Sequence, residues 1–163
     1  MIIRAAKRED LEGIFEIYDE QVLHGTATFD TTPKTEAERL EWFANDAKGR
    51  YPFLVAEDNG RITGWTRLYA WSNRCAYDRA AENAVYVHKD ARGKGIGRAL
   101  LTELIRLAPE RGVKLLIARV VEGNAGSLAL HEALGFQTIG IMRRCGEKFG
   151  RLLDVRLMDR HLD

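Results

Sequence analysis

The sequence has little cysteine, little proline and no long apolar run. Its 163 residues contain two cysteines, Cys75 and Cys145, with no CxxC pair and no His/Cys cluster at metal-ligand spacing. We therefore expect two free thiols, a reducing compartment such as the cytoplasm, and no bound metal. No apolar run approaches the roughly 20 residues that span a bilayer. The start, MIIRAAKRED, becomes charged too early for a secretory signal.

The chain also lacks an excess of charge of either sign. It has 25 lysines and arginines against 24 acidic residues, which gives a formal net charge of +1. A strong basic excess is typical of proteins that bind nucleic acid or anionic membranes, so we expect neither partner. The basic residues do not gather on one helix face and no base-stacking motif is present, which disfavours a nucleic-acid-binding module further.

Nothing in the sequence marks a boundary between domains. The three prolines, at 33, 52 and 109, are isolated, and no linker, repeat or low-complexity tract divides the chain. The length is ordinary for one domain with its own hydrophobic core. We therefore expect a single domain over residues 1–163.

Apolar spacing predicts four helices. Asp10 stands where a helix cap belongs, and Thr35 with Glu38 matches a capping box. Pro109 is expected to end or kink the third helix, and Gly135 to stop the fourth. The helices are predicted at residues 11–22, from 35 onward, at 96–108 and at 126–134.

Short apolar runs between these helices predict strands. The turn Asp58-Asn59-Gly60 joins two of them as a hairpin, and residues 24–29 break the helical pattern and predict a loop. Strands mixed with helical crossovers indicate the α/β class. The strands are predicted at residues 1–5, 53–57, 62–70, 85–88, 113–121, 137–144 and 153–158.

Residues 92–97 read RGKGIG, between a predicted strand and a predicted helix. Glycines there expose backbone N–H groups, and the helix start adds a partial positive charge, which favours a phosphate. Arg92, Lys94 and Arg98 add cations. The spacing fits neither the G-x-G-x-x-G dinucleotide fingerprint nor the G-x-x-x-x-G-K-[ST] loop. A glycine-rich turn that binds no ligand is the alternative.

The same six residues match [QR]-x-x-G-x-[GA] and resemble the acetyl-coenzyme A pyrophosphate loop of the GNAT (Gcn5-related N-acetyltransferase) superfamily. VYVHKDA (85–91) resembles the family's fourth strand, and EGNAGSLALHEALGF (122–136) resembles its N-x-x-[AS]-x-x-[LF]-[YH]-x-x-x-GF segment. The resemblance implies the α/β GNAT fold. That fold is a mixed central sheet of about six to seven strands flanked by about four helices, splayed at the acetyl-CoA site.

Four further segments resemble the phosphinothricin / methionine sulfoximine N-acetyltransferase branch. They are IFEIYDEQV (14–22), TATF (26–29), YPFLVAE (51–57) and KFGR with LD (148–154). The branch implies transfer of an acetyl group from acetyl-CoA to the α-amino group of a small amino acid or analogue, by direct attack on the thioester. It also implies a homodimer, to which the tail 149–157 would contribute a strand.

The resemblance further implies which residues hold acetyl-CoA. The backbone of Val85, Tyr86 and Val87 would pair with the pantetheine arm, and the following N–H groups would take the pyrophosphate. Asn124 could instead cap the helix after it, and Arg92 and Lys94 could be ordinary exposed cations. The implied contacts are Val85, Tyr86, Val87, Arg92, Gly93, Lys94, Gly95, Ile96, Gly97, Arg98, Asn124 and Ser127.

Two residues are candidates for the catalytic step. Glu82 precedes the predicted strand at 85 and matches the glutamate of the branch's [TV]-V-E-[HN]-S-V-Y-V segment, so the resemblance assigns it as general base, directly or through water. A free α-amino group has a pKa of about 8, so modest help suffices. His131 stands where many relatives have tyrosine, and it either donates to the departing thiolate or only packs.

The acceptor pocket is where the sequence departs most from the branch. The usual RPAYRYTVEHSVYV stretch is here NRCAYDRAAENAV (73–85), and Leu152 replaces a common tryptophan. Arg74 is the candidate for holding the acceptor's carboxylate, and Trp71 is a candidate wall. The predicted acceptor residues are Phe29, Ser72, Asn73, Arg74, Tyr77, Glu82 and Asn83.

These departures leave the identity of the acceptor open. A protein N-terminus, a polyamine or another amine is the alternative acceptor, and such molecules would require an open groove or an acidic pocket. Arg74 argues against a cationic acceptor. A coenzyme A-binding sensor without turnover is the alternative of another class, and the retained Glu82 speaks against it.

Overall fold

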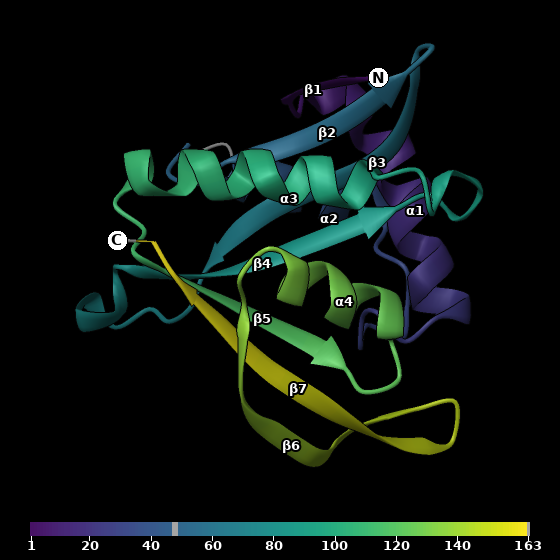
Figure 1. The fold of residues 1–163 in the computed structure, drawn as a ribbon. Helices are drawn as coiled ribbons and strands as arrows, with labels where there is room; N and C mark the ends of the chain where they lie inside the picture. Colours follow the sequence, from purple (N-terminus) through teal and green to yellow (C-terminus); the bar gives the residue numbers. More distant parts are fainter. Residues whose placement is uncertain (47–48, 163) are drawn as a thin grey trace.

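The computed structural model describes residues 1–46 and 49–162, which form one seven-stranded sheet with helices on both sides (Figure 1). The strand order is β1-β2-β3-β4-β5-β7-β6. Neighbouring strands are antiparallel except β4 and β5, which are parallel. The strands are β1 (Ile2–Ala5), β2 (Phe53–Asp58), β3 (Arg61–Ala70), β4 (Ala80–Val87), β5 (Leu115–Val121), β6 (Gln137–Lys148) and β7 (Arg151–His161).

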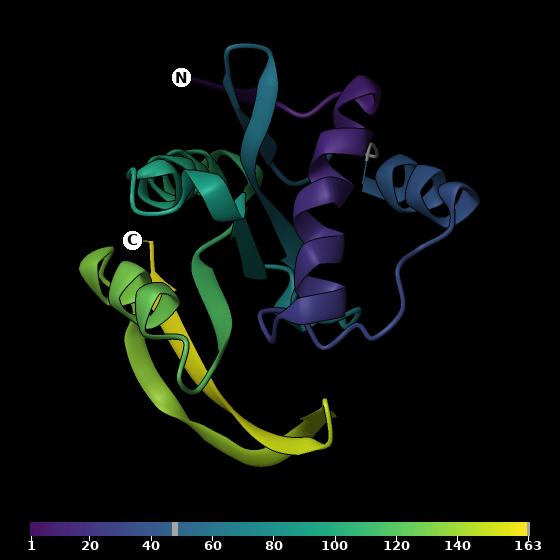
Figure 2. The same ribbon diagram turned by 90° about the vertical axis from the view of Figure 1, so that its right-hand side faces the viewer.

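Four α-helices accompany the sheet, as predicted. They are α1 (Leu11–His24), α2 (Glu36–Asp46), α3 (Ile96–Leu107) and α4 (Ala125–Ala133). Figure 2 shows α1 and α2 on one side of the sheet and α3 and α4 on the other. No helix in the described part of the chain combines the length and the hydropathy that a membrane span requires.

Each side of the sheet has its own apolar core. Ile14 and Phe15 of α1 pack against Trp65 of β3 on one side. Leu101 and Leu104 of α3, both 0% exposed, pack on the other side with residues of β4, β5 and β7. This double coverage explains why β2, β3 and β5 are predicted within two residues of their observed bounds, because both faces of these strands carry apolar residues.

The helix ends show which capping predictions hold. Glu38 donates its backbone N–H to the Thr35 hydroxyl at 3.3 Å, and Thr35 N–H donates to the Glu38 carboxylate at 2.7 Å, so the capping box is confirmed. Before Pro109, α3 ends at Leu107 and continues as a 3₁₀ turn, Ala108–Arg111.

Asp10 does not cap α1 as predicted. Its carboxylate accepts the backbone N–H of Lys7 at 2.7 Å and both terminal nitrogens of Arg4 at 2.8 Å. No hydrogen bond from the first turn of α1 reaches this side chain. The guanidinium of Arg4 lowers the pKa of Asp10, which is the chief effect on this buried carboxylate. The tertiary contact with β1 therefore replaces the local cap.

Strand β4 begins at Ala80, five residues before the predicted start at 85. Its first residues are small or charged and show no apolar run, but pairing with β3 and β5 holds them in extended form. Glu82 therefore lies within β4, and the prediction that it precedes the strand is wrong. β6 begins at Gln137 as predicted but runs four residues further, to Lys148, and β7 is longer than predicted at both ends. The prediction stopped short because β6 is mostly exposed and carries polar residues at this end.

The β6–β7 hairpin curves out of the sheet toward the C-terminal end of α1 (Figure 2). The strand register shifts between Thr138 and Gly140 and again between Met142 and Gly146, which is the usual source of such bending. At its far end, the buried Lys148 donates from Nζ to the carbonyls of Gln21 at 2.9 Å and Thr28 at 2.8 Å. The hairpin is thus joined to the loop that follows α1.

Candidate active site

The sheet opens between β4 and β5. These parallel strands pair only from Ala80 with Leu115 to Glu82 with Ile117. Beyond Glu82, β4 continues to pair with β3, while β5 pairs with β7. The other edge of β4, from Asn83 to Val87, has no partner strand in the described part of the chain. An extended ligand can therefore form strand-like hydrogen bonds there, as the predicted splay requires.

The loop 92–95 enters α3 beside the end of β4. Gly93 and Gly95 have φ angles of +74° and +78°, the left-handed region that favours glycine. No atom lies within 4 Å of a Cβ built at either residue, so both backbones face open space. Gly95 caps α3 without a side chain, and no acidic residue occupies the first turn. The N–H groups of that turn are available to an anion, and their contact with the pyrophosphate stays a prediction.

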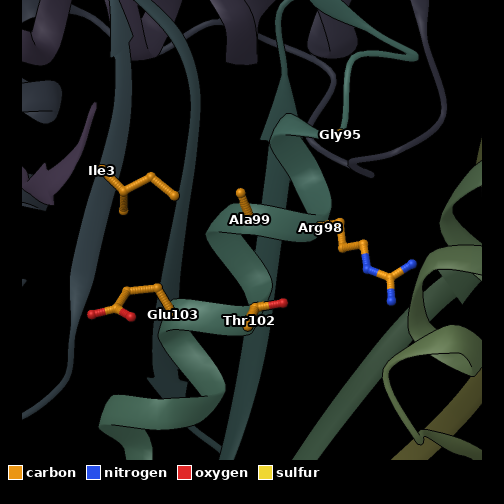
Figure 3. Close-up of a pocket in the computed structure, with 6 residues that line it drawn as sticks. All are labelled: Ile3, Gly95, Arg98, Ala99, Thr102 and Glu103. Atoms are coloured by element: carbon orange, nitrogen blue, oxygen red, sulfur yellow. The ribbon is translucent and has the colours of Figure 1, made fainter. Parts of the chain in front are cut away.

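The three cations of this loop differ in their contacts. Arg92 lies 3.5 Å from the carboxylate of Glu20 on α1, and Lys94 donates to the carbonyl of Asp90 at 3.2 Å. In the close-up of Figure 3, Arg98 points away from Ile3 and Glu103. Those residues border a groove of about 530 Å³ between α3 and β1. Arg98 lines the same groove, and its guanidinium points away from these two residues.

Asn124 caps the start of α4, which was the alternative to its predicted contact with acetyl-CoA. Asn124 Oδ1 accepts the backbone N–H of Ser127 at 3.2 Å. The Ser127 carbonyl in turn lies 2.8 Å from Nδ1 of His131. Asn124 and Ser127 therefore build the first turn of α4 and connect it to His131, and their contact with acetyl-CoA stays a prediction.

His131 is buried on α4, with 2% of its surface exposed. Nδ1 faces a carbonyl and is therefore the protonated nitrogen, so Nε2 accepts from the Asn83 amide at 2.9 Å. The ring of Phe136 meets it edge-on at 4.9 Å between centroids. Burial lowers the pKa of His131, which favours the neutral ring. This geometry matches the packing alternative, since neither nitrogen has a proton free to donate elsewhere.

Alternate residues of β4 point to opposite faces of the sheet. Val85 and Val87 pack with the α3 side, whereas Ala84 and Tyr86 pack with the α1 side. Asn83 shares the first face, and Glu82 the second. Asn83 therefore does not line a pocket with Glu82, contrary to the prediction that both bind the acceptor.

The Glu82 side chain lines a pocket of about 470 Å³ on the α1 side of the sheet. The side chain is 17% exposed, and both of its oxygens are bound by Arg119 of β5, with Nε at 2.6 Å and Nη2 at 2.7 Å. The hydrogen bonds that Arg119 donates to Glu82 raise the pKa of Arg119 further, so the guanidinium stays charged. The pocket is lined by Tyr18, Tyr69, Ala70, Trp71, Glu82, Ala84, Tyr86 and Arg119.

The aromatic wall of this pocket is joined to the loop after α1. Tyr18 donates its hydroxyl to the carboxylate of Asp30, and Tyr86 donates to the carbonyl of Ala27 at 3.2 Å. Burial is the chief cause that raises the pKa of both tyrosines, so both hydroxyls keep their protons at neutral pH. The wall is therefore rigid and uncharged.

The remaining predicted acceptor residues lie outside this lining. Ser72, Asn73, Arg74 and Tyr77 stand on the turn between β3 and β4, where Tyr77 is 49% exposed. Arg74 donates its backbone N–H to Ser72 at 3.2 Å. Phe29 lies against Gly146 of the hairpin, so closely that a Cβ there would overlap its ring. The structure therefore does not bring these five residues together with Glu82.

Sequence reasoning missed Tyr18, Tyr69 and Arg119. Arg119 had a signal, since it is the one charged residue in the strand LLIARVV and the one exposed residue within it. Tyr18 and Tyr69 had none, because they lie far apart in sequence and only the sheet brings them together. No group of three metal-ligating side chains occurs within residues 1–46 and 49–162.

Comparison with known proteins identifies the family. The family model described as an acetyltransferase (GNAT) domain matches residues 3–157. A Pseudomonas aeruginosa protein named L-methionine sulfoximine/L-methionine sulfone acetyltransferase is 41% identical, over 99% of this chain and 94% of its own length.

Solved structures agree with this match. A phosphinothricin acetyltransferase from Sinorhizobium meliloti, solved with acetyl-CoA, superposes with a TM-score of 0.95 at 42% identity, over 99% of this chain and 88% of that one. A protein described as ribosomal-protein-alanine N-acetyltransferase from Brucella melitensis superposes with a TM-score of 0.96 at 38% identity, covering 99% and 100%.

Proposed function

The chain belongs to the GNAT acetyltransferase family, and we propose that it transfers the acetyl group of acetyl-CoA to the α-amino group of a small amino acid or analogue. Methionine sulfone, methionine sulfoximine and phosphinothricin are the acceptor types that the relatives' names support. One observation carries the proposal: Glu82 stands where the open edge of β4 meets a pocket with aromatic walls.

The chain's own residues suit the binding of acetyl-CoA on the α3 side. The free N–H groups at the start of α3 bind the pyrophosphate, and Arg92, Lys94 and Arg98 add positive charge around it. The open edge of β4 at Val85–Val87 hydrogen-bonds the pantetheine arm. These contacts place the thioester near Glu82, where β4 and β5 separate.

Glu82 then acts as the general base. It takes a proton from the acceptor's ammonium group, directly or through a water molecule, and leaves a neutral amine. The amine nitrogen forms a bond to the thioester carbon and loses its second proton to solvent, and the carbon–sulfur bond breaks with its electron pair on sulfur. Since both nitrogens of His131 are engaged, we propose that it orients Asn83 and that the thiolate takes its proton from solvent.

We also propose that the chain acts as a single domain, in the cytoplasm, as a homodimer. The free thiols of Cys75 and Cys145 agree with a reducing compartment. The β6–β7 hairpin supports the dimer, because β6 lies at the edge of the sheet and the hairpin exposes large apolar side chains. These are Ile139, Ile141, Met142, Phe149 and Leu152. Light scattering on an Ile141→Glu variant tests it, since a dimer across this edge would dissociate.

The reaction is tested by following free thiol release from acetyl-CoA. The acceptors are methionine sulfone, methionine sulfoximine, phosphinothricin, ordinary amino acids, a polyamine and a short peptide. Release with the amino acids alone supports the proposal. Release with the polyamine or the peptide alone would overturn it, and tight acetyl-CoA binding without release would favour a sensor.

A protein N-terminus is the second candidate acceptor. The Brucella structure, described as acting on a ribosomal protein, is as close in fold as the amino-acid acetyltransferases. Glu82 would serve as base for either acceptor, so the peptide arm of the same assay separates the two functions.

A further inference from the structure

The pocket beside Glu82 contains one negative and one positive side chain, and they are paired with each other. Glu82 and Arg119 share two hydrogen bonds of 2.6 and 2.7 Å. The other six residues that line the pocket are uncharged. Any charged group that enters the pocket therefore meets this pair first.

The pair is poorly suited to a purely structural role. The Arg119 side chain is 53% exposed, so solvent screens the attraction within the pair. Its neighbours in β5, Ala118 and Val120, are buried on the opposite face, so the α3-side core does not require an arginine at 119. The sequence instead places a cation at the one exposed position of the strand, beside the proposed base.

An α-amino acid carries the complementary arrangement of charges. Its ammonium and carboxylate groups are attached to one carbon, so they are separated by about the width of an ion pair. The carboxylate of Glu82 and the guanidinium of Arg119 are separated by a similar distance. A bound zwitterion can therefore exchange the internal pair for two pairs with the protein, and no charge is left without a partner.

We propose that Arg119 binds the α-carboxylate of the acceptor while Glu82 receives its ammonium group. This proposal rests on the proposed function and names the feature of the acceptor that the site selects. The guanidinium turns from Glu82 to the acceptor's carboxylate, which frees the Glu82 oxygens to accept the proton. An amine without a carboxylate leaves Arg119 on Glu82 and the base engaged.

The same argument separates Arg119 from Arg74. Arg74 is exposed on the turn between β3 and β4 and does not line the pocket. Arg119 lies within hydrogen-bonding distance of the base itself. Since the carboxylate of an α-amino acid must lie close to its own amine, the cation beside Glu82 is the one placed to bind it.

The test compares methionine sulfone with 3-(methylsulfonyl)propylamine, the same molecule without the carboxylate. Wild type is expected to prefer the amino acid. In Arg119→Ala, kcat/KM for the amino acid is expected to fall about 100-fold, chiefly through KM, because a charge-assisted hydrogen-bonded pair is lost. For the amine it should rise or stay constant, because the substitution removes the guanidinium that engages Glu82, so the preference collapses.

Arg106→Ala is the matched control. Arg106 on α3 has a similar exposure, 58%, and forms the same two-bond pair with Glu103 at 2.8 and 3.0 Å, outside the pocket. It should retain wild-type kinetics with both acceptors. Arg119→Lys keeps the positive charge but cannot donate two parallel hydrogen bonds to a carboxylate, so it should recover part of the preference for the amino acid. Calorimetric binding of methionine sulfone, without acetyl-CoA, should follow the same order.

The outcomes distinguish this proposal from the function it rests on. An equal loss on both acceptors in Arg119→Ala would show that the arginine only orients Glu82 and would overturn the proposal. If Arg74→Ala lost the preference for the amino acid and Arg119→Ala kept it, the carboxylate would be bound by Arg74 on the turn between β3 and β4, and the proposal would be overturned. If wild type acetylates neither acceptor, the proposed function itself fails.

Discussion

The two faces of β4 differ in how the chain builds a site. On the α3 side, one short segment supplies the strand edge, the glycine turn and the helix start, all within residues 83–98. On the α1 side, α1 and β5 each supply one residue to the pocket, while β4 supplies three, as does β3 with the residue that follows it. The first site depends mainly on backbone groups, and the second depends on side chains from distant parts of the sequence.

This difference distinguishes a site that tolerates changes in its side chains from one that does not. Backbone N–H groups bind a phosphate whatever the neighbouring side chains are, provided that the glycines permit the turn. A pocket of side chains changes with each substitution, and it determines which amine is accepted. Substitutions on the two faces should therefore alter different kinetic constants. Three substitutions test this, and a fourth prediction, with the smallest effect, concerns the stability contributed by His131.

Replacing the base on the α1 face should have the largest effect. Glu82→Gln keeps the shape of the side chain but cannot take a proton, so kcat should fall by about 10²- to 10⁴-fold. The KM for acetyl-CoA should not change, because the cofactor binds on the other face. Steady-state thiol release measures both constants. Retained kcat with weakened acetyl-CoA binding would reverse the assignment of the faces.

Detaching the β6–β7 hairpin from the loop after α1 should change the KM for the acceptor but not the KM for acetyl-CoA. Lys148→Met removes two hydrogen bonds that hold the loop after α1, to which Tyr18 and Tyr86 are joined. The acceptor KM should rise about tenfold, and the free energy of unfolding should fall by about 2 kcal/mol. Lys148→Arg should restore part of both, as measured by urea unfolding and kinetics. A rise in the acetyl-CoA KM instead would count against the comparison.

Straining the glycine turn should affect only the α3 face. Gly95→Ala forces a left-handed φ of +78° on a residue with a Cβ, which costs about 1 kcal/mol. The acetyl-CoA KM should rise severalfold and the acceptor KM should stay constant. Gly126→Ala is the control, because a Cβ there has open space and no positive φ, so it should not destabilise the protein. Equal effects of both substitutions would contradict the role of the turn.

The smallest effect concerns pH. Burial lowers the pKa of His131 below its usual 6.5, so the unfolded chain binds a proton at a higher pH than the folded one. Stability should therefore fall as pH drops through 6.5, and level off below the folded pKa. Between pH 7 and pH 6 this contributes at most about 0.7 kcal/mol. His131→Gln should lack this contribution in urea titrations, and an unchanged slope would show that other groups cause it.

The sequence predicts the α3 face well because its determinants are local. The glycines, the helix start and the strand before them are contiguous, and the structure confirms the turn and the opening beside it. The fold follows for a similar reason, since most helices and strands carry clear apolar periodicity. The exceptions are the start of β4 and the ends of the β6–β7 hairpin, which only pairing with neighbouring strands holds in place.

The α1 face could not be predicted in the same way. Glu82 was found through a motif, but its partner Arg119 lies 37 residues further along the chain. Asn83 was predicted to bind the acceptor with Glu82 because the predicted strand began two residues after it, so the alternation of the two side chains could not be read. Asp10 failed as a cap because Arg4 competes for it. Each of these contacts depends on how segments pack together and not on the local apolar pattern.

The central claim is that acetyl-CoA and the acceptor reach Glu82 from opposite faces of β4. A crystal structure of Glu82→Gln with acetyl-CoA and methionine sulfone tests it most directly. We expect the pyrophosphate on the N–H groups of residues 93–98, the pantetheine along Val85–Val87, and the amine among Tyr18, Tyr69 and Gln at position 82. Both ligands on the α3 side, or an acceptor bound away from this pocket, would contradict the claim.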